Sequence, residues 1–287
     1  VPAVIWDRPY AGILSSRGCP FDCTYCNCPT FSDRKCTWRS AENVLQELNE
    51  IRRQGYRAFT FLDDNFLLKP DRALQVCDGL ISQGHDFRWA CEGRAEAATQ
   101  PFFDRLRKAG CDVIMFGVES GSQRQIDLLR KRTKLAEVEK AVRCAVRAKI
   151  GIVHAFFIVG TPGETVDEVK ATFDLADRLP IGSFNFNSLT AFRGTALWED
   201  AVAKGLINDD RDWDKMFSTH EIYADAIPSA ELFALRSKLV KRLIRRKLLL
   251  HPFGAARVLR RFLTCMSLGD IYRILTSTKK KQVGPRK

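Results

Sequence analysis

The sequence predicts an α/β fold built on a parallel sheet, and three observations support this. Short apolar runs alternate with amphipathic helical segments about every 30 residues. Most helical segments end at a glycine or a proline, and polar or glycine-containing residues follow each apolar run. Such alternation produces parallel strands joined by right-handed helical crossovers. Because ligands bind at the carboxyl ends of parallel strands, we expect these polar segments to meet at one end of the sheet.

The first half of the chain supplies three of the expected strands. Residues 11–14, 58–62 and 87–91 are apolar runs of strand length. Ser40 and Asp71 are placed to cap the two helices between these strands, and Gly55 and Gly84 to end them.

The second half continues the pattern with a short helix over 101–109 and a longer one around 138–146. Strands are expected at 112–118, 152–159 and 183–190. Thr165 and Glu168 form a capping-box pair that opens a helix stopped by Pro180, and Gly194-Thr195 opens another. Six βα units result.

Composition limits the class of protein. The chain has 287 residues, of which 45% are hydrophobic and 28% charged, which fits a globular protein with a full core. It shows no apolar run long enough to span a membrane and no signal peptide at its start. Ten cysteines without a secretory signal indicate a reducing compartment, so we expect a cytoplasmic location. We expect residues 1–12 to be a linker or the end of an upstream segment, because the chain begins at Val1.

Charge is concentrated in the C-terminal region. Residues 229–287 contain sixteen Lys or Arg and two acidic residues, whereas the rest of the chain is near neutral although the total net charge is +12. Leu232, Leu235 and Leu239 begin an apolar stripe at helical spacing among these bases. Two interpretations stay open: a basic amphipathic helix on an anionic membrane surface, or a helix that covers the open side of the barrel.

Three cysteines, Cys19, Cys23 and Cys26, have the spacing C-x3-C-x2-C directly after the first strand. Thiolates at this spacing can converge on a soft metal, either zinc or an iron–sulfur cluster. A zinc site would need a fourth ligand, and Cys28 is too close in sequence for the usual spacer. An open metal position, which indicates chemistry, is the interpretation we favour over three unrelated buried thiols.

This pattern resembles the radical S-adenosylmethionine (SAM) superfamily, whose signature is C-x3-C-x2-C with an aromatic residue before the third cysteine, here Tyr25. The resemblance covers about 13–205 and is closest to the branch whose members usually carry an N-terminal cobalamin-binding domain. The sequence motifs that resemble those of this branch lie at residues 16–21, 61–66, 116–122 and 160–165. At 193–195 the chain has Arg-Gly-Thr where the branch usually has Pro-Gly-Thr.

The resemblance implies a partial (β/α)6 TIM-like barrel over 13–205 with a basic C-terminal helical extension. That extension is expected to be mostly helical over 206–275 and disordered over 276–287. The resemblance also implies that Cys19, Cys23 and Cys26 hold three irons of a [4Fe-4S] cluster. SAM would bind the fourth iron and be cleaved to a 5′-deoxyadenosyl radical.

The resemblance implies further contacts to SAM, each with a plain structural alternative. Phe21 and Tyr25 would shield the cluster and touch adenine, and Asp63 and Asp64 would bind the methionine ammonium group. The remaining implied contacts are Arg94 to the methionine carboxylate, Glu119 and Ser120 to the ribose, and the Gly160 turn to the adenosine. As alternatives, Phe21 and Tyr25 would be ordinary loop aromatics, and Asp63 and Asp64 would solvate a strand end. Arg94 would form a surface ion pair, and Gly160 would belong to a tight strand-to-helix turn.

The expected function is C-methylation or a related biosynthetic reaction on a small-molecule or lipid-like substrate. Cobalamin could act only through a domain or partner outside these residues, because no D-x-H-x-x-G motif is present. A flavodoxin or ferredoxin type of electron donor is expected, together with peripheral membrane contact through the basic tail. A tRNA-modifying enzyme of the methylthiotransferase type and a non-catalytic iron–sulfur scaffold are the alternatives, although nucleic acid is not an expected partner.

Overall fold

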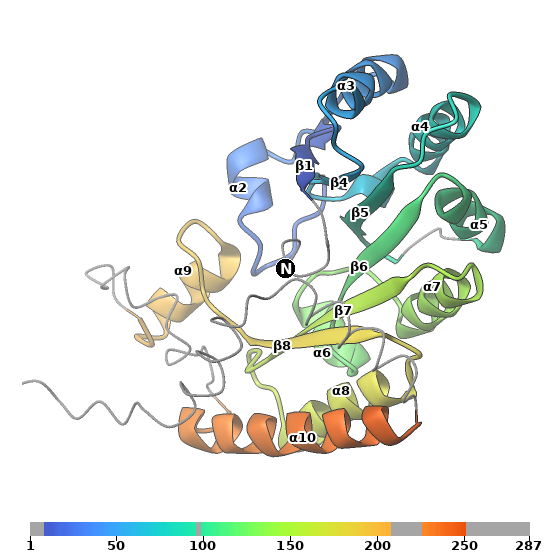
Figure 1. Cartoon of the computed structure of the whole chain (residues 1–287). Helices are drawn as coiled ribbons and strands as arrows, with labels where there is room; N and C mark the ends of the chain where they lie inside the picture. The colour runs from blue at the N-terminus through green and yellow to red at the C-terminus, as the bar shows by residue number, and fades with distance from the viewer. Residues whose placement is uncertain (1–8, 96–98, 208–225, 251–287) are drawn as a thin grey trace, which may run out of the picture.

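A six-stranded, all-parallel sheet forms the centre of the molecule (Figure 1), in a computed structural model that describes residues 9–95, 99–207 and 226–250. The strand order is β1-β4-β5-β6-β7-β8, so each strand of this sheet pairs with the next one along the chain, while β2 and β3 form a separate two-stranded antiparallel sheet. The strands of the main sheet are β1 (Tyr10–Ile13), β4 (Ala58–Phe61), β5 (Arg88–Gly93), β6 (Cys111–Glu119), β7 (Ile152–Val159) and β8 (Ser183–Ser188). The small sheet consists of β2 (Ser16–Arg17) and β3 (Thr37–Trp38).

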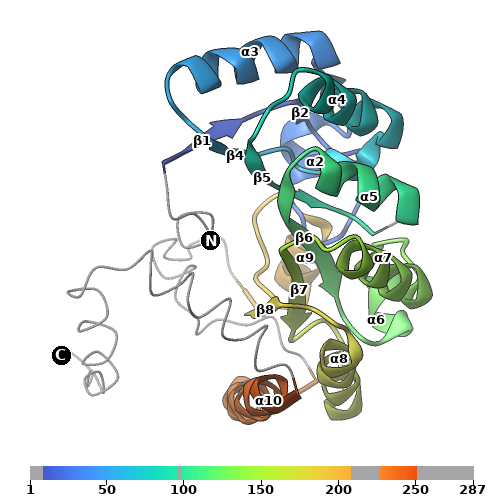
Figure 2. The ribbon, with the colours of Figure 1, turned by 45° about the vertical axis from the view of Figure 1, so that its right-hand side comes forward.

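Helices cover the outer side of the curved sheet, as Figures 1 and 2 show. The main outer helices are α3 (Ala41–Arg53), α4 (Pro70–Ser82), α5 (Gln100–Lys108), α7 (Leu135–Arg147) and α8 (Val166–Arg178). Shorter elements are α2 (Cys28–Ser32), η1 (Phe66–Leu68), α6 (Gln123–Leu128) and α9 (Ala196–Ala203). The expected α/β fold, a partial (β/α)6 barrel, is confirmed.

The capping residues explain where two of these helices begin. Ser40 accepts a hydrogen bond from the backbone of Asn43 at the start of α3. Thr165 and Glu168 form the predicted capping box of α8. The prediction for α4 was wrong in detail, because the helix begins at Pro70 and Asp71 lies inside its first turn. A proline needs no backbone donor at that position, which makes it a favourable first residue.

The barrel is open because β1 and β8 are edge strands that do not pair with each other. Inside it, a small apolar cluster fills the end at which the strands begin: Ala58, Ala90, Val113, Met115 and Ile152. Tyr10 and Phe156 pack against this cluster. Towards the other end, where the strands finish, the interior is not filled, and a cavity results.

The C-terminal helix α10 (Ser229–Leu250) packs against α8. Leu232 and Leu243 are buried in the main core, whereas Ile244 is exposed. Lys247 at its far end donates to the backbone carbonyl of Asp177 at 3.0 Å, near the end of α8. The apolar stripe therefore packs on the outer helix α8, and Arg236 of the same helix donates to Ser188 at the end of the edge strand β8. The predicted features of residues 251–287 lie outside the described residues.

Candidate functional site

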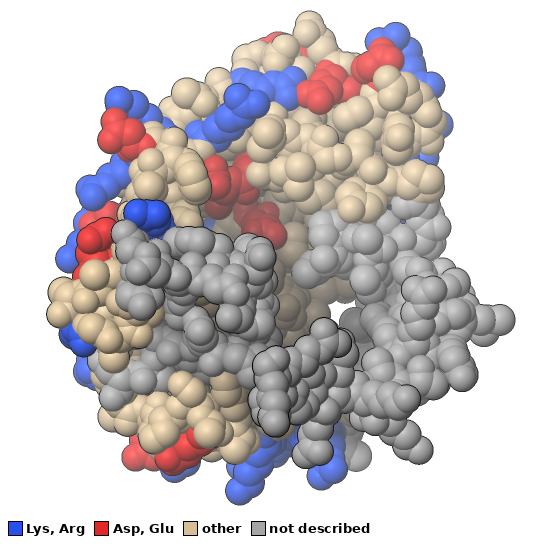
Figure 3. All heavy atoms as spheres, turned by 90° about the vertical axis from the view of Figure 1, so that its left-hand side faces the viewer, with Lys and Arg blue, Asp and Glu red and all other residues tan. Residues whose placement is uncertain are grey.

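A cavity of about 710 Å³ lies at the carboxyl ends of the strands. Figure 3 shows a hollow in this region with Asp and Glu atoms inside it. Its lining combines the cysteine loop, strand ends β5 to β8 and one residue of α10. The lining residues used below are Cys19, Cys23, Tyr25, Cys26, Asp64, Glu92, Arg94, Met115, Gly117, Glu119, Lys131, Phe156, Ile158, Asn187, Ser188, Leu189, Thr190, Phe192 and Arg236.

The cysteine loop is held by backbone hydrogen bonds to distant segments. Thr24 N donates to the carbonyl of Leu129 at 3.0 Å, and Leu197 N donates to the carbonyl of Thr24 at 2.9 Å. At its start, Gly18 N donates to the Asp64 carboxylate at 2.8 Å. Gly18 has a φ of +89°, and a Cβ there would lie 2.0 Å from the carbonyl oxygen of Lys35. Only glycine fits this position, so the loop has a defined path before its first cysteine.

The three predicted cluster ligands, Cys19, Cys23 and Cys26, all line the cavity. Within the described residues, no three His, Cys, Asp or Glu side chains are grouped closely enough to bind a single metal ion. An iron–sulfur cluster takes one thiolate at each of its irons, so three thiols on one loop would hold three irons of such a cluster.

Burial also affects the protonation of the thiols in the cysteine loop. Burial raises the pKa of the Cys19 and Cys26 thiols, so neither is a ready thiolate without a metal. Coordination removes the proton from a thiol directly. Burial likewise raises the pKa of Cys28 to about 12, but this thiol does not line the cavity.

Arg94, at the end of β5, anchors this side of the cavity. Its guanidinium lies 3.7 Å from the ring centroid of Phe21 and donates to Cys23 Sγ at 3.5 Å. It also donates to Thr133 Oγ1 at 3.0 Å and to the carbonyl oxygen of Lys131. These contacts explain why Arg94 is buried, and they link the cysteine loop to the segment after α6. Phe21 supports Arg94 and does not line the cavity.

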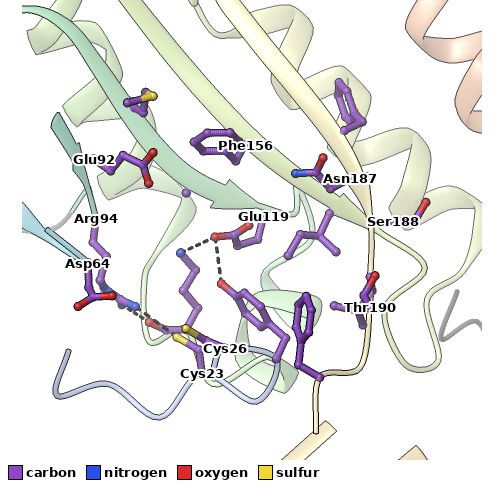
Figure 4. Close-up of a pocket in the computed structure, with 18 of the residues that line it drawn as sticks. Cys23, Cys26, Asp64, Glu92, Arg94, Glu119, Phe156, Asn187, Ser188 and Thr190 are labelled. Atoms are coloured by element: carbon purple, nitrogen blue, oxygen red, sulfur yellow. Dashed lines mark hydrogen bonds and ion pairs between the residues drawn. The ribbon is translucent and has the colours of Figure 1, made fainter. Parts of the chain in front are cut away.

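Tyr25, Glu119 and Lys131 form a buried polar cluster at the cavity wall (Figure 4). Tyr25 OH donates to Glu119 Oε1 at 3.0 Å, and Lys131 Nζ contacts the same oxygen at 2.7 Å. Burial, followed by the charge of Glu119, raises the pKa of Tyr25 well above its ordinary value, so the phenol keeps its proton as a donor. Glu119 Oε2 makes no hydrogen bond to a described residue.

Two backbone features make this cluster fit. Glu119 has a φ of +68°, which is strained for a residue with a side chain. A Cβ on Gly117 would lie 2.5 Å from Glu119 Oε1 and 3.0 Å from Lys131 Nζ. The absence of a side chain at 117 therefore leaves room for the ion pair above the strand.

Besides Phe21, three predicted SAM contacts do not line the cavity. Asp63 accepts hydrogen bonds from Ser15 N at 2.7 Å and from the hydroxyls of Ser15 and Ser16, so it fixes the end of β1. Ser120 is fully buried 3.2 Å from Thr172 Oγ1. Gly160 N donates to Glu164 Oε2 at 2.6 Å within a tight turn. In the structure all three residues stabilise the loops that carry the site, and their contacts to SAM stay predictions.

Several cavity residues were not predicted as site residues. Lys131 lies in a basic stretch whose composition suggests only a solvated loop. Phe156, Ile158 and Asn187 lie on β7 and β8, where strand alternation shows which residues face inward but gives no chemical signal. Glu92 faces the cavity, and burial among protein atoms raises its pKa. Arg236 comes from α10, outside the barrel sequence.

Comparison with protein families gives a direct match. Residues 13–176 match the Radical SAM superfamily. The chain belongs to the radical SAM superfamily. The match begins at the end of β1 and ends within α8, so it covers the cysteine loop and most of the barrel.

Relatives of this radical SAM chain include proteins named as methyltransferases. An uncharacterised methyltransferase of Pyrococcus horikoshii is 33% identical over 69% of this chain and 43% of its own length. The cytidylyl-2-hydroxyethylphosphonate methyltransferase of Streptomyces wedmorensis is 27% identical over 69% of this chain and 38% of its own. The chain thus spans less than half the length of these two relatives.

Among solved structures, the methyltransferase TsrM from Kitasatospora setae, with tryptophan and a SAM analogue bound, has a TM-score of 0.67 at 18% identity. That match covers 79% of this chain and 51% of TsrM. A second TsrM structure, with cobalamin and a [4Fe-4S] cluster bound, has a TM-score of 0.66 at 16% identity and covers 83% of this chain and 51% of TsrM. These similarities confirm the radical SAM fold. None of the helices described here is long and apolar enough to cross a membrane.

Proposed function

We propose that this protein binds a [4Fe-4S] cluster and SAM in the cavity and uses them for C-methylation or a related biosynthetic reaction. The observation that carries the proposal is that three thiols at the superfamily spacing line the same cavity as Asp64 and Glu119. When bound, the cluster supplies the electron that cleaves the sulfonium bond of SAM and releases a 5′-deoxyadenosyl radical.

The chain's own residues bind and orient the cofactors. Cys19, Cys23 and Cys26 would hold the cluster, and Asp64 would accept hydrogen bonds from the methionine ammonium group. Arg94 is placed near Cys23 and would attract the methionine carboxylate. The Oε2 atom of Glu119 would accept from a ribose hydroxyl. Tyr25, held by Glu119, would form one wall beside the cluster.

Methyl transfer is the reaction class that the named relatives support. Cobalamin would reach this site only through a domain or partner outside these residues. The substrate is a small or lipid-like molecule, because Met115, Phe156 and Ile158 make part of the cavity apolar. We expect the reaction to take place in the reducing cytoplasm.

Anaerobic reconstitution with iron and sulfide, followed by reduction in the presence of SAM, tests the proposal. We expect 5′-deoxyadenosine, together with S-adenosylhomocysteine if methyl groups are transferred. A reconstituted protein that carries a four-iron cluster and releases neither product contradicts the proposal. The ratio of the two products distinguishes methyl transfer from hydrogen abstraction alone.

The electron donor, of flavodoxin or ferredoxin type, would dock on the outer side of the cysteine loop. A groove there is lined by Cys23, Cys26, Arg34 and Arg130. Asp22 and Asp33 in this groove are paired with Arg132 and Lys35. Arg34 and Arg130 have no acidic partner among the described residues and would attract an acidic donor.

Reduction kinetics test this docking surface. The double variant R34E/R130E should slow reduction by a protein donor and leave reduction by dithionite unchanged. Equal rates with the protein donor would exclude the groove as its binding site.

Membrane contact through residues 229–287 stays a prediction. In the described part of this segment, Leu232 and Leu243 are buried against the core, so the contact would depend on other residues. Vesicle pelleting of the full chain, with and without residues 251–287, tests this, and equal pelleting excludes a role for the tail.

A further inference from the structure

Arg236 brings a positive charge from the C-terminal helix to the side of the cavity formed by β8. Its Nη1 donates to Ser188 Oγ at 2.8 Å, and its guanidinium lies 5.0 Å from the ring centroid of Phe233. Ser188 is the last residue of β8. The guanidinium is therefore held at the open end of the barrel by one strand residue and one residue of its own helix.

No acidic residue in the described part of the chain pairs with Arg236. The other two cations of the cavity differ in this respect: Lys131 is paired with Glu119, and Arg94 is enclosed by Cys23, Thr133 and a backbone carbonyl. Arg236 is half-buried, and its desolvation lowers its pKa. A guanidinium that has lost water and gained no anion from the described residues can bind an anionic ligand.

Neutral donors accompany Arg236 at this end of the cavity. Asn187 and Thr190, labelled in Figure 4, line the cavity beside Ser188. Amide and hydroxyl groups can donate to the oxygens of a carboxylate, phosphonate or phosphate group. Leu189 and Phe192 add apolar surface next to them.

The two ends of the cavity thus differ in charge, because three carboxylates (Asp64, Glu92 and Glu119) outnumber the two cations Arg94 and Lys131 on the cysteine-loop side, whereas Arg236 lies beside β8. Asp64 and Glu92 line the side of β4 and β5. Strands β5 and β8 are separated by β6 and β7, which corresponds to about 14 Å along the sheet at about 4.8 Å between strands. A cationic cofactor such as SAM is favoured at the acidic side, which leaves the Arg236 side for the substrate.

We propose that the substrate is an organic anion with an apolar body, and that Arg236 binds its carboxylate, phosphonate or phosphate group. Asn187 and Thr190 complete the anion site, and the apolar body lies against Phe156 and Ile158. This inference rests on the proposed function, because it assigns SAM to the other side of the same cavity. It names the substrate class and makes α10 a specificity element of the site.

Binding without turnover tests the inference. The full chain, with its cluster reconstituted and SAM present but no reductant, is titrated calorimetrically with 4-phenylbutyrate, phenylphosphonate and the neutral analogue 4-phenylbutanol. Wild type should bind at least one anion about tenfold or more tightly than the alcohol. R236Q should lose that preference, R236K should keep part of it, and K238Q, an exposed neighbour on α10, should match wild type.

The outcomes separate the two proposals. The inference is overturned if wild type shows no preference for either anion, or if R236Q keeps the preference in full. If R236Q does not fold, the inference is tested by the anion preference of wild type and by the partial loss of that preference expected in R236K. Adding reductant to the same samples then tests SAM cleavage independently: anion preference without 5′-deoxyadenosine contradicts the proposed function alone, and 5′-deoxyadenosine without anion preference contradicts this inference alone.

Discussion

The two sides of the cavity are built differently. On the cysteine-loop side, polar groups bind one another: Arg94 contacts Cys23, and Glu119 contacts both Tyr25 and Lys131. On the β8 side, Arg236 contacts Ser188, while the side chains of Asn187 and Thr190 form no hydrogen bond to a described residue. The cysteine-loop side is therefore arranged before any ligand binds. The β8 side leaves polar groups that can form hydrogen bonds to a ligand.

This difference indicates a division of tasks. A rigid, internally satisfied wall suits a cofactor that must be held in one orientation. A wall of unsatisfied donors and apolar surface determines which substrate enters. The following predictions test the division, beginning with the change that should have the largest effect.

Replacing Cys23 with Ala should abolish the cluster, because all three thiolates are needed to hold it in the protein. We expect iron after anaerobic reconstitution to fall from about four per chain to a small fraction of that. Cys28→Ala is the matched control, since its thiol lies two residues after Cys26 but outside the cavity. A full four-iron cluster in C23A, measured by iron analysis and electron paramagnetic resonance, would refute the ligand assignment.

Replacing Lys131 with Met should test how strongly the cysteine-loop side is pre-arranged. The change leaves the buried Glu119 carboxylate without its cation and should reduce the free energy of unfolding by about 3–5 kcal/mol. Urea unfolding measures the effect. The double variant K131M/E119Q should recover much of the loss, because no buried charge remains. A loss below about 1 kcal/mol in K131M would show that this wall is not held by the ion pair.

His154 on β7 tests the end of the barrel at which the strands begin, where its Nδ1 lies 3.0 Å from Ser183 Oγ. Burial lowers the pKa of His154 from 6.5 to about 4. The unfolded chain therefore binds a proton below pH 6.5 that the native state does not bind until about pH 4. Stability should fall as pH decreases across this window, by up to about 3 kcal/mol from this residue.

The measurement is urea unfolding at several pH values for wild type and H154Q. H154Q should be less sensitive to acid over the window, whereas H85Q, at a partly exposed histidine, should change the slope less. Parallel curves for wild type and H154Q would contradict the buried, neutral state of His154.

Replacing Gly117 with Ala should have the smallest effect of the four. The new Cβ would displace Glu119 Oε1 and Lys131 Nζ, and overpacking of this kind reduces stability by about 1–3 kcal/mol. Gly182→Ala is the control, because the nearest atom to its Cβ would be 4.0 Å away. Equal unfolding midpoints for the two variants would show that the ion pair moves aside without loss.

The sequence predicted the parts of this molecule whose signals are local. The cysteine spacing, the βα alternation and the Thr165–Glu168 capping box each lie within one short segment, and the structure contains all three segments as expected. The sequence also predicted which residues follow the end of a strand, but it did not predict where their side chains point. Asp63 and Asp64 are adjacent, yet one binds Ser15 and the other lines the cavity.

The residues that were missed depend on contacts between distant segments. Lys131 is recognisable only once Glu119 is seen beside it, and Arg236 only once α10 is seen against α8. No motif marks either residue, because its role follows from tertiary packing and not from its neighbours in sequence.

The attachment of α10 has a consequence for how this protein could diversify. Its far end is fixed to α8 by Lys247 and Arg246, and Arg246 pairs with Asp177 at 2.9 Å. Moving the helix by one turn would shift Arg236 by about 5.4 Å along the cavity and leave the cysteine loop unchanged. Substitutions or a slip in register within one peripheral helix could therefore alter substrate choice while the cofactor chemistry is inherited intact.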